Sequence, residues 1–369
     1  MRAPVEITLM LAGDVMLGRS LDQILPYPGA PEIFESYMRS ALDYVSLAEL
    51  RAGPIPRHVP FAYVWGEALA EIARLRPDLR IVNLETAATV RGSPEPKGIN
   101  YRMTPANLPC LAAAGIDCCT LANNHVLDFG AQGLADTLDG LGRMGMAFAG
   151  AGRDEAEAQA PAILPLPGGG RVLVHAAATR SSGVPDGWAA GPGRLGVHLI
   201  DETSVEEADR LAARMAQARR PGDLTVLSVH WGGNWGYEVP PAQRAFARRL
   251  VAAGAADVIH GHSSHHFKGA EIYQGKAILY GCGDLINDYE GIGGHEEFRG
   301  ALVLLYFLRL RAADGQLAGF EVAPFRLHRF RLSRIDAADA RWIRRRIEAT
   351  YAFPPGPVAL PRIAEPDEA

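Results

Sequence analysis

The sequence predicts an α/β protein in which buried strands, largely parallel, alternate with amphipathic helices. Short apolar runs typical of buried strands alternate with helical patterns along most of the chain. Side chains of the kinds that bind metals follow directly after several of these runs. With 369 residues, 48% of them hydrophobic, the chain can bury a large core. We expect a main domain at residues 1–330 with a surface insertion at 26–62, and a C-terminal helix and tail at 331–369 packed on it.

The first predicted strand, residues 7–12, leads into Gly13 and Asp14. A carboxylate at the end of a buried strand needs a cation or the N–H groups of a following helix, and both explanations stay open here. The charged, Pro-rich insertion is expected to contain one helix, at residues 33–50. A second helix, at 63–75, precedes a strand at 79–83, which is followed by Glu85.

Residues 120–130, Thr-Leu-Ala-Asn-Asn-His-Val-Leu-Asp-Phe-Gly, are the most informative stretch of the chain. They follow a short apolar strand at 115–119 and precede a predicted helix at 132–144. They therefore lie on a strand-to-helix turn, where open α/β sheets carry active sites. The turn offers amide oxygens, an imidazole and a carboxylate, from Asn123, Asn124, His125 and Asp128. The alternative is that the asparagines make turn hydrogen bonds and His125 only fills space.

The second half of the chain repeats this arrangement, and its first hairpin is expected to begin a second half of the same sheet. Ser204 and Glu207 form a capping box at the start of a helix that continues to residue 219. The remaining predicted elements are a hairpin (162–166 with 172–178), strands at 224–229, 257–259, 277–281, 301–310 and 320–327, and helices at 105–114, 241–253 and 337–349. These strands deliver three histidines and one further acid to their carboxyl ends.

Six strand ends together carry a set of potential metal ligands: Asp14, Glu85, Asn124 with His125, His230, His262 with His265, and Asp284. Strands that run in the same direction end at the same edge of a sheet, so we expect these side chains to converge. One histidine at a strand end is commonly structural, whereas this many at successive strand ends indicates a metal site. A mixed set of imidazole, amide and carboxylate ligands favours Mn, Fe or Zn over Ca or Mg.

Composition excludes several other classes of protein. A net charge of -5 and a pI near 6.1 give no electrostatic basis for binding nucleic acid or an anionic membrane. The chain runs into its first strand without a signal peptide or membrane segment, so we expect a cytoplasmic protein.

The four cysteines lack the spacing of a zinc knuckle and are expected to be buried free thiols: Cys110, Cys118, Cys119 and Cys282. The oligomeric state is left open.

Five ordered motifs resemble the CapA-type family of capsule and poly-γ-glutamate biosynthesis, within the calcineurin-like metallophosphoesterase superfamily. They are Gly13-Asp14, Asn83-Leu84-Glu85, Asn123-Asn124-His125, His230-Trp231-Gly232 and Gly261-His262-Ser-Ser-His265. The resemblance covers residues 7–284. It implies a four-layer α/β/β/α metallophosphoesterase-like sandwich, which agrees with two sets of strands flanked by helices.

The resemblance also implies roles for individual residues around two divalent metals. Asp14 and His265 would hold the first metal, Glu85 would bridge, and the second would be completed by Asn124, His230 and His262. His125 would give a proton to the leaving group, with Asp128 orienting its imidazole.

Three features depart from the pattern of the wider superfamily. Met16 stands where that pattern supplies a second ligand to the first metal, and a thioether is a poor ligand for hard ions. The spacing from His262 to His265 is one residue longer. Asp284 stands where many CapA-type chains have Asn, and we treat it as a possible additional ligand that repairs the first site.

Cations and aromatic residues near the motifs suggest an anionic substrate. We expect the substrate to be contacted by Arg19, Lys97, Arg102 and Trp231. Trp235 and Tyr237 could also form part of the pocket wall. The alternative for the cations is a solvated loop face, and the alternative for the aromatic residues is ordinary packing within a loop. The resemblance implies a metal-dependent hydrolase or transferase that uses a metal-activated water on a small anionic molecule, such as a γ-glutamyl or carboxylate-rich peptide or a capsule-related molecule. A phosphoesterase acting on a small phosphoester and a non-enzymatic component of poly-γ-glutamate assembly or export remain as alternatives, because fold alone does not choose among them.

Overall fold

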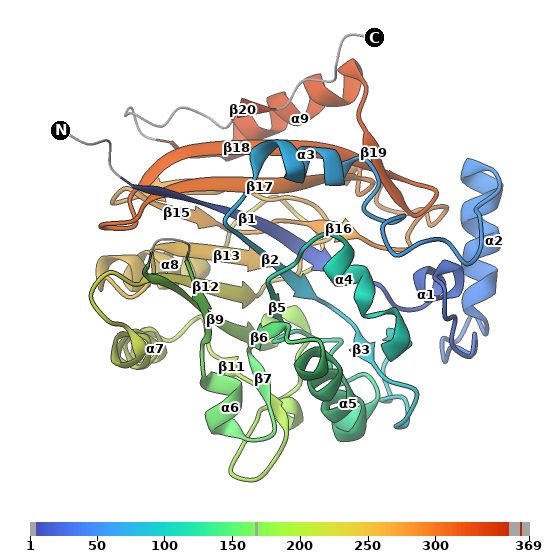
Figure 1. Cartoon of the computed structure of the whole chain (residues 1–369), viewed down its shortest axis with the longest axis horizontal. Coiled ribbons are helices and arrows are strands. Elements are labelled where there is room, and N and C mark those ends of the chain that lie inside the picture. The colour runs from blue at the N-terminus through green and yellow to red at the C-terminus, as the bar shows by residue number, and fades with distance from the viewer. Residues whose placement is uncertain (1–4, 167–168, 354–361, 364–369) are drawn as a thin grey trace.

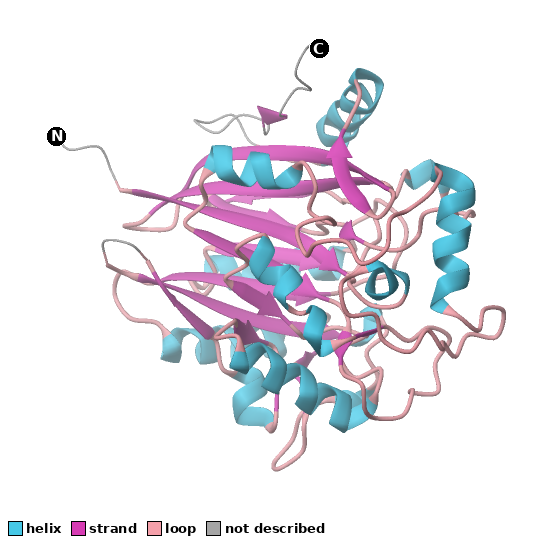
Figure 2. Ribbon diagram, turned by 45° about the vertical axis from the view of Figure 1, so that its right-hand side comes forward, coloured by secondary structure: helices cyan, strands magenta, loops and turns pink. Residues whose placement is uncertain are grey.

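Two β-sheets lie face to face, and helices cover the outer side of each (Figures 1 and 2). The computed structural model describes residues 5–166, 169–353 and 362–363. The strands between residues 162 and 279 do not extend the first sheet, as the strand pattern led us to expect, but build a sheet of their own. Hydrophobic periodicity sets the type of an element but not its hydrogen-bonding neighbours, so the sequence pattern alone could not separate these two arrangements.

The first sheet combines a parallel part from the N-terminal half with antiparallel strands from the C-terminal part. Its strands in spatial order are β19 (Arg331–Arg334), β18 (Leu317–His328), β17 (Leu302–Arg311), β1 (Glu6–Val15), β2 (Leu79–Leu84), β5 (Cys118–Thr120) and β6 (Ala147–Ala149), with β16 (Asp284–Ile286) beside β1 and β20 (Arg362–Ile363) beside β18. The strands β1, β2, β5, β6 and β16 are parallel, so their carboxyl ends lie at one edge. Strand β19 continues this sheet beyond residue 330.

The second sheet is also largely parallel. Its order is β11 (Leu199–Ile200), β9 (Arg171–Thr179), β12 (Leu224–His230), β13 (Val258–His262), β15 (Lys276–Leu279) and β14 (Ala270–Tyr273), with β8 (Ala162–Pro165) beside β9. The predicted hairpin of β8 and β9 is confirmed, and β14 and β15 form a second antiparallel hairpin. His230 and His262 are register partners at the ends of adjacent parallel strands.

The helices complete four layers. They are α1 (Ser20–Ile24), α2 (Ala41–Ala52), α3 (Ala68–Leu75), α4 (Pro109–Ala113), α5 (Gly130–Arg143), α6 (Glu155–Gln159), α7 (Val205–Ala218), α8 (Pro241–Ala252) and α9 (Ala337–Thr350), and two short strand pairs, β3 (Ala87–Ala88) with β4 (Arg102–Met103) and β7 (Ala151–Gly152) with β10 (Gly196–Val197), lie outside the main sheets. Figure 1 shows α3, α4 and α5 beside the first sheet, and α7 and α8 beside the second.

The second sheet is buried on both faces, and its side chains alternate between two cores. Val174 and Ala176 of β9 join the large core shared with the first sheet, whereas Ala177 joins the core that packs against α7 and α8. This alternation is what a period of two residues dictates for a strand with two buried faces. The α/β fold with its four layers is therefore confirmed.

Two predicted helices are shorter than expected. The helix expected at residues 33–50 is α2, which begins only after Ser40, because the Ser40 hydroxyl accepts a hydrogen bond from the Leu42 N–H and caps it. The helix expected at 63–75 is α3, preceded by turns in which Gly66 has φ +45°. In contrast, the Ser204 cap of α7 is confirmed, since its hydroxyl accepts from the Glu207 N–H at 3.1 Å.

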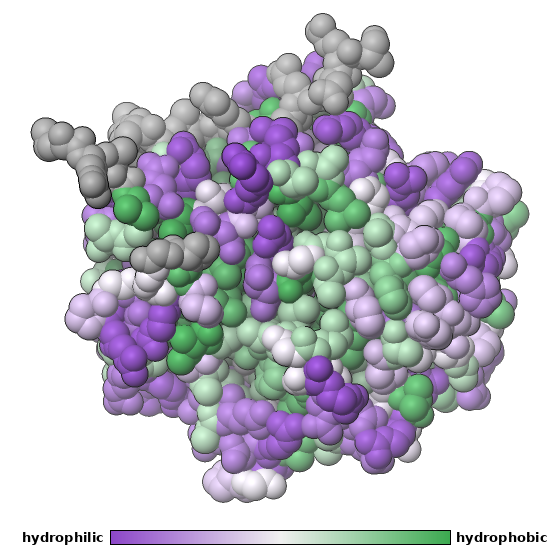
Figure 3. All heavy atoms as spheres, viewed as in Figure 1, coloured by the Kyte–Doolittle hydropathy of each residue, from purple (hydrophilic) through white to green (hydrophobic). Residues whose placement is uncertain are grey.

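The cysteines, the helices and the surface show features typical of a globular domain with a buried core. All four cysteines are buried and free, as predicted. Within the described ranges, no helix has the length and apolar character needed to cross a membrane. On the face shown in Figure 3, hydrophilic residues predominate around the periphery and hydrophobic residues are more frequent toward the middle.

Candidate metal centre

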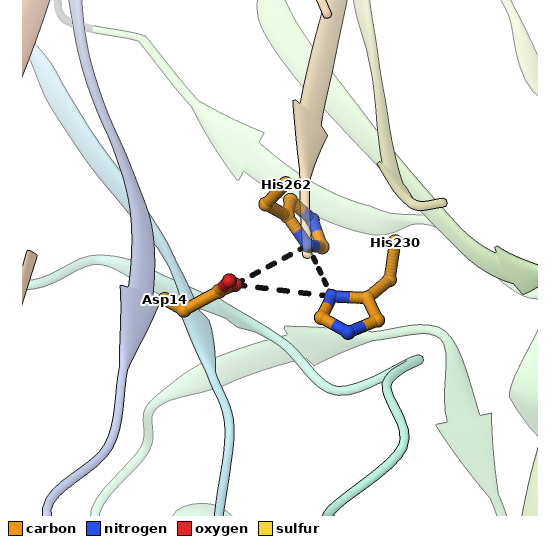
Figure 4. A group of neighbouring side chains, drawn as sticks. All are labelled: Asp14, His230 and His262. Atoms are coloured by element: carbon orange, nitrogen blue, oxygen red, sulfur yellow. Dashed lines mark hydrogen bonds and ion pairs between the residues drawn. The ribbon is translucent and has the colours of Figure 1, made fainter. Parts of the chain in front are cut away.

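Three side chains from the carboxyl ends of three strands meet between the two sheets (Figure 4). Asp14 comes from β1, His230 from β12 and His262 from β13, and all three are buried. The Nδ1 atoms of His230 and His262 are 2.8 Å apart, and Oδ1 of Asp14 is 3.8 and 3.5 Å from them respectively. One ligand atom from each lies within 4.8 Å of the other two. These three atoms are arranged to share one cation.

The backbone around Asp14 explains its position. A Cβ atom at Gly13 would lie 1.7 Å from the carbonyl oxygen of Gly283, so only glycine lets β1 approach that segment. This approach sets Asp14 opposite Asp284 in parallel register. The Asp14 carboxylate accepts hydrogen bonds from the Asn83 side chain at 2.7 Å and from the Ser263 N–H at 3.1 Å. Ser263 adopts φ +101°, a strained conformation of the kind that concentrates at functional sites.

Glu85 and Asn124 border the same cluster on the side of His230. Oε1 of Glu85 lies 3.7 Å from Nε2 of His230, and Oδ1 of Asn124 lies 3.0 Å from the same nitrogen. The other carboxylate oxygen of Glu85, Oε2, is buried and has no hydrogen-bond partner among the described residues. An unpaired buried carboxylate oxygen is costly unless it binds a cation.

His265 and Asp284 border the cluster on the side of Asp14. Nδ1 of His265 is 3.0 Å from Oδ1 of Asp284, whose other oxygen accepts from the Asn287 side chain at 2.8 Å. Asp284 therefore lies where an additional ligand was predicted, beside both Asp14 and His265. The position of Met16 differs from that of a ligand: its sulfur accepts a hydrogen bond from the Tyr289 hydroxyl at 3.7 Å.

The electrostatics of the cluster favour the presence of cations. Burial, together with the charge of Asp284, raises the pKa of Asp14 to about 7. Burial, with the charges of Asp14 and Asp284, also holds the pKa of Glu85 well above its usual value. Burial holds the pKa values of His230 and His262 well below theirs, so both imidazoles are neutral and have free lone pairs. Neutral imidazoles beside crowded carboxylates fit divalent transition metals.

The orientation of the imidazoles is set by their outer hydrogen bonds. Nε2 of His262 lies 2.8 Å from the Ser228 hydroxyl, which leaves Nδ1 directed at Asp14 and His230. In the turn at residues 120–130, the Asn123 side chain accepts from the N–H groups of His125 and Val126. The alternative of turn hydrogen bonds therefore holds for Asn123 alone, while Asn124 and His125 face the cluster.

His125 and Asp128 form a hydrogen-bonded pair beside the cluster. Nδ1 of His125 is 2.6 Å from Oδ2 of Asp128, and Nε2 points toward Glu85, 3.8 Å from its Oε1. Asp128 also accepts from the ammonium of Lys97 at 2.8 Å and from the Tyr101 N–H at 2.6 Å. Burial lowers the pKa of His125 to about 4 against the opposing charge of Asp128. Because Asp128 accepts the Nδ1 proton, Nε2 is the atom that can gain or give a proton at the cluster.

The four residues predicted to contact substrate have different surroundings. Lys97 lies at the cluster, where it also donates to the Asn124 carbonyl, and its side chain is 28% exposed. Arg102 packs on an aromatic ring instead, with its guanidinium 4.5 Å from the centre of the Phe129 ring. Trp231 lies in the core between the second sheet and α8, donating to the Tyr280 carbonyl at 2.9 Å. A pocket-wall role for Trp231 is therefore corrected to a packing role.

Arg19 is likewise corrected from a substrate contact to a buried ion pair. It is 3% exposed and donates to both oxygens of Asp288, at 2.8 and 2.5 Å, and to Glu35 at 2.6 Å. All three nitrogens of its guanidinium are thus engaged by two acids. Arg19 thus links the start of α1 to Glu35 in the insertion and to Asp288 in the segment after β16.

Arg19→Ala is expected to destabilise the fold by about 3–5 kcal/mol, because it leaves Asp288 and Glu35 buried without a partner. Chemical denaturation measures this loss. As a matched control, Arg309→Ala breaks the exposed pair with Glu6 and should cost under about 1 kcal/mol. Unchanged stability of the Arg19→Ala protein would contradict the structural role of the ion pair and would leave the substrate contact as the explanation for Arg19.

Several residues that shape the site were given no role in the site from the sequence. Asn83 fixes Asp14, Ser228 fixes His262, and the Tyr101 and Tyr289 rings pack edge-on against His125 and His265, with centroids 4.6 and 5.2 Å apart. Asn83 had a signal, since it ends a strand two residues before Glu85. The two tyrosines had none, because their hydroxyl contact at 3.0 Å joins residues 188 positions apart.

The chain is similar to known proteins over most of its length. Residues 8–289 match the family described as "Bacterial capsule synthesis protein PGA_cap". The chain is 48% identical over 347 residues to the "Probable polyglutamine synthesis accessory protein" of Mycobacterium tuberculosis, covering 94% of this chain and 91% of that protein. It is 26% identical over 325 residues to the "PGA biosynthesis protein CapA" of Bacillus subtilis, covering 87% and 72%.

Among solved structures, a phosphatase from Mycoplasma pneumoniae is similar at 14% identity with a TM-score of 0.49, over 88% of this chain and 94% of that one. The family match spans all the strand ends that supply the cluster, from Asp14 to Asp284.

Proposed function

The chain belongs to the family of bacterial capsule synthesis proteins described as PGA_cap, and on that premise we propose that it is a metal-dependent hydrolase of γ-glutamyl amides in carboxylate-rich peptides. The observation that carries this proposal is the position of the His125–Asp128 pair directly beside the cluster of Asp14, His230 and His262. A purely structural metal site needs no buried proton-transfer pair at its edge. The glutamyl substrate class is taken from the name of the relative in Bacillus subtilis, a PGA biosynthesis protein.

Seven side chains at the cluster are the candidate metal ligands. Divalent cations would be held by Asp14, Glu85, Asn124, His230, His262, His265 and, as an additional ligand, Asp284. Bound there, Mn, Fe or Zn supplies Lewis-acid activation of water and neutralises negative charge on the substrate. The buried, unpaired oxygen of Glu85 and the neutral imidazoles support this assignment.

The proton steps would be carried out by His125 and Asp128 in the turn at residues 120–130. Hydrolysis adds the hydroxyl of water to the amide carbon and a proton to the departing nitrogen as the C–N bond breaks. Nε2 of the neutral His125 ring faces the cluster, so it would first take the proton that the attacking water loses and then deliver it to that nitrogen, while Asp128 accepts the Nδ1 proton and stabilises the imidazolium between the two transfers. Lys97 holds Asp128 in place and presents a partly exposed positive charge to an anionic substrate.

The test is a turnover screen with defined metals. Purified protein is loaded separately with Mn, Fe(II) or Zn and assayed on a γ-glutamyl oligopeptide, by release of new amines, and on aryl phosphates. We expect amide hydrolysis that a chelator abolishes and added metal restores. Turnover of aryl phosphates alone would replace this proposal with a phosphoesterase, and bound metal without turnover on either panel would favour an accessory component without enzymatic activity.

A further inference from the structure

A cluster of aromatic rings adjoins the metal centre and takes no part in the proposed proton steps. It is built from the loop after β12 (Trp235, Tyr237), from His266, and from the segment after β16 (His295, Phe298). The Trp235 ring stacks on His295 with centroids 3.9 Å apart, and His266 stacks on Phe298 at 4.5 Å. Three segments far apart in the sequence thus form one wall.

This aromatic cluster contains two buried polar atoms that have no hydrogen-bond partner among the described residues: the Tyr237 hydroxyl and Nε2 of His266. The two rings pack edge to face, with centroids 4.6 Å apart. Nδ1 of His266 donates to the Phe267 carbonyl at 3.0 Å, so Nε2 of the neutral ring is a hydrogen-bond acceptor. The cluster therefore offers one donor and one acceptor side by side, and native proteins seldom leave such atoms unpaired.

Two cationic side chains lie near these two atoms. The Arg346 guanidinium lies 4.0 Å from the centre of the Tyr237 ring. Lys268 is 6% exposed, its charge acts on His266, and it has no ion-pair partner in the part of the chain that the structure describes. Glu297 is the carboxylate that faces Tyr237, and it is exposed to solvent. Cations that have no counterion beside the cluster among the described residues favour an anionic ligand over a neutral or cationic one.

The aromatic cluster is also contiguous with the metal centre. The Trp235 ring centroid is 5.4 Å from that of His265, whose Nδ1 bonds to Asp284. His265 and His266 are neighbours in the chain and face the two clusters respectively. A ligand that extends from the metal centre past Trp235 would reach Tyr237 and His266.

We propose that Tyr237 and His266 form a subsite for the glutamyl unit next to the cleaved amide, the Tyr237 hydroxyl donating to its carboxylate and Nε2 of His266 accepting from its amide N–H. Lys268 and Arg346 supply the balancing positive charge, and the Trp235 and Phe298 rings contact the methylene groups. A ligand for this subsite must carry negative charge and also donate a hydrogen bond to a buried imidazole, and a γ-glutamyl unit does both. This subsite deepens, and rests on, the proposed γ-glutamyl hydrolase function.

The test measures binding rather than turnover. γ-Glutamylglutamate is titrated, by calorimetry, into metal-loaded His125→Ala protein, which would not consume it. In that background, Tyr237→Phe removes only the unpaired hydroxyl, and we expect the Kd for the dipeptide to rise about tenfold, the loss typical of one hydrogen bond to a charged group. Metal content should be unchanged.

The matched control is Tyr273→Phe on β14, whose ring lies 5.1 Å from the Arg248 guanidinium in a similar arrangement away from the cluster. Its Kd should equal that of the His125→Ala parent. Equal Kd values for Tyr237→Phe and the parent, or a parent that binds no dipeptide, would overturn the subsite. Failure of the proposed function has a different signature, namely a wild type that holds no metal or hydrolyses no γ-glutamyl peptide.

Discussion

His125→Ala is expected to retain bound metal and to hydrolyse γ-glutamyl peptide about 10²- to 10⁴-fold more slowly than the wild type, the range typical of a lost general acid. Nε2 of His125 lies 3.8 Å from Glu85, at the edge of the cluster, and its ring is held from behind by Asp128. Removing the imidazole takes away the proton donor and leaves Asp14, His230 and His262 in place. The measurement is kcat on the oligopeptide, with elemental analysis of the same protein.

An exposed histidine that is not part of the cluster provides the control for this variant. The His328 side chain is 47% exposed and pairs with Glu290 at 3.3 Å, so His328→Ala should keep the wild-type rate. If His125→Ala also turned over at close to the wild-type rate with its metal intact, the proton-donor role would be removed.

His262→Ala is expected to lose both metal affinity and turnover. His262 presents Nδ1 to the cluster, and its orientation depends on Ser228. Loss of outer-shell partners alone typically weakens metal binding 10- to 100-fold, so loss of a direct ligand should weaken it by about 100-fold or more. Metal-binding titrations followed by activity assays would measure both effects.

The control for His262→Ala truncates another buried imidazole. His198 is 5% exposed, its Nδ1 bonds to the Ala176 carbonyl at 3.1 Å and its Nε2 lies beside Arg214 of α7, so its imidazole is not one of the candidate ligands. His198→Ala should therefore lower stability and leave metal affinity unchanged. Equal metal affinities for His262→Ala and the wild type would exclude His262 as a ligand.

The strand ends were predictable from the sequence because each one combines a buried strand with a polar residue that burial alone would penalise. Asp14, His230 and His262 are such residues, and they converge as expected. The division into two sheets was not predictable from periodicity, yet it does not disturb the convergence, because the carboxyl ends of both parallel sets face the same region. The register of His230 with His262 brings their imidazoles together.

The substrate contacts were harder to predict, for two different physical reasons. Trp231 follows His230 directly, and side chains of successive strand residues point to opposite faces, so its place in the core could have been inferred from the position of His230. Arg19 could not have been placed from sequence alone, since one of its acidic partners, Asp288, lies 269 positions away. The aromatic cluster of Tyr237 and His266 likewise forms only in the folded chain.

The most direct test of the metal centre is an anomalous-scattering map from crystals soaked in Mn or Zn, with data collected at the absorption edge of the soaked metal. We predict the strongest peak among Oδ1 of Asp14, Nδ1 of His230 and Nδ1 of His262. A map with no peak there, in crystals that bind the metal only at other positions, would contradict the claim that these strand ends form a metal centre.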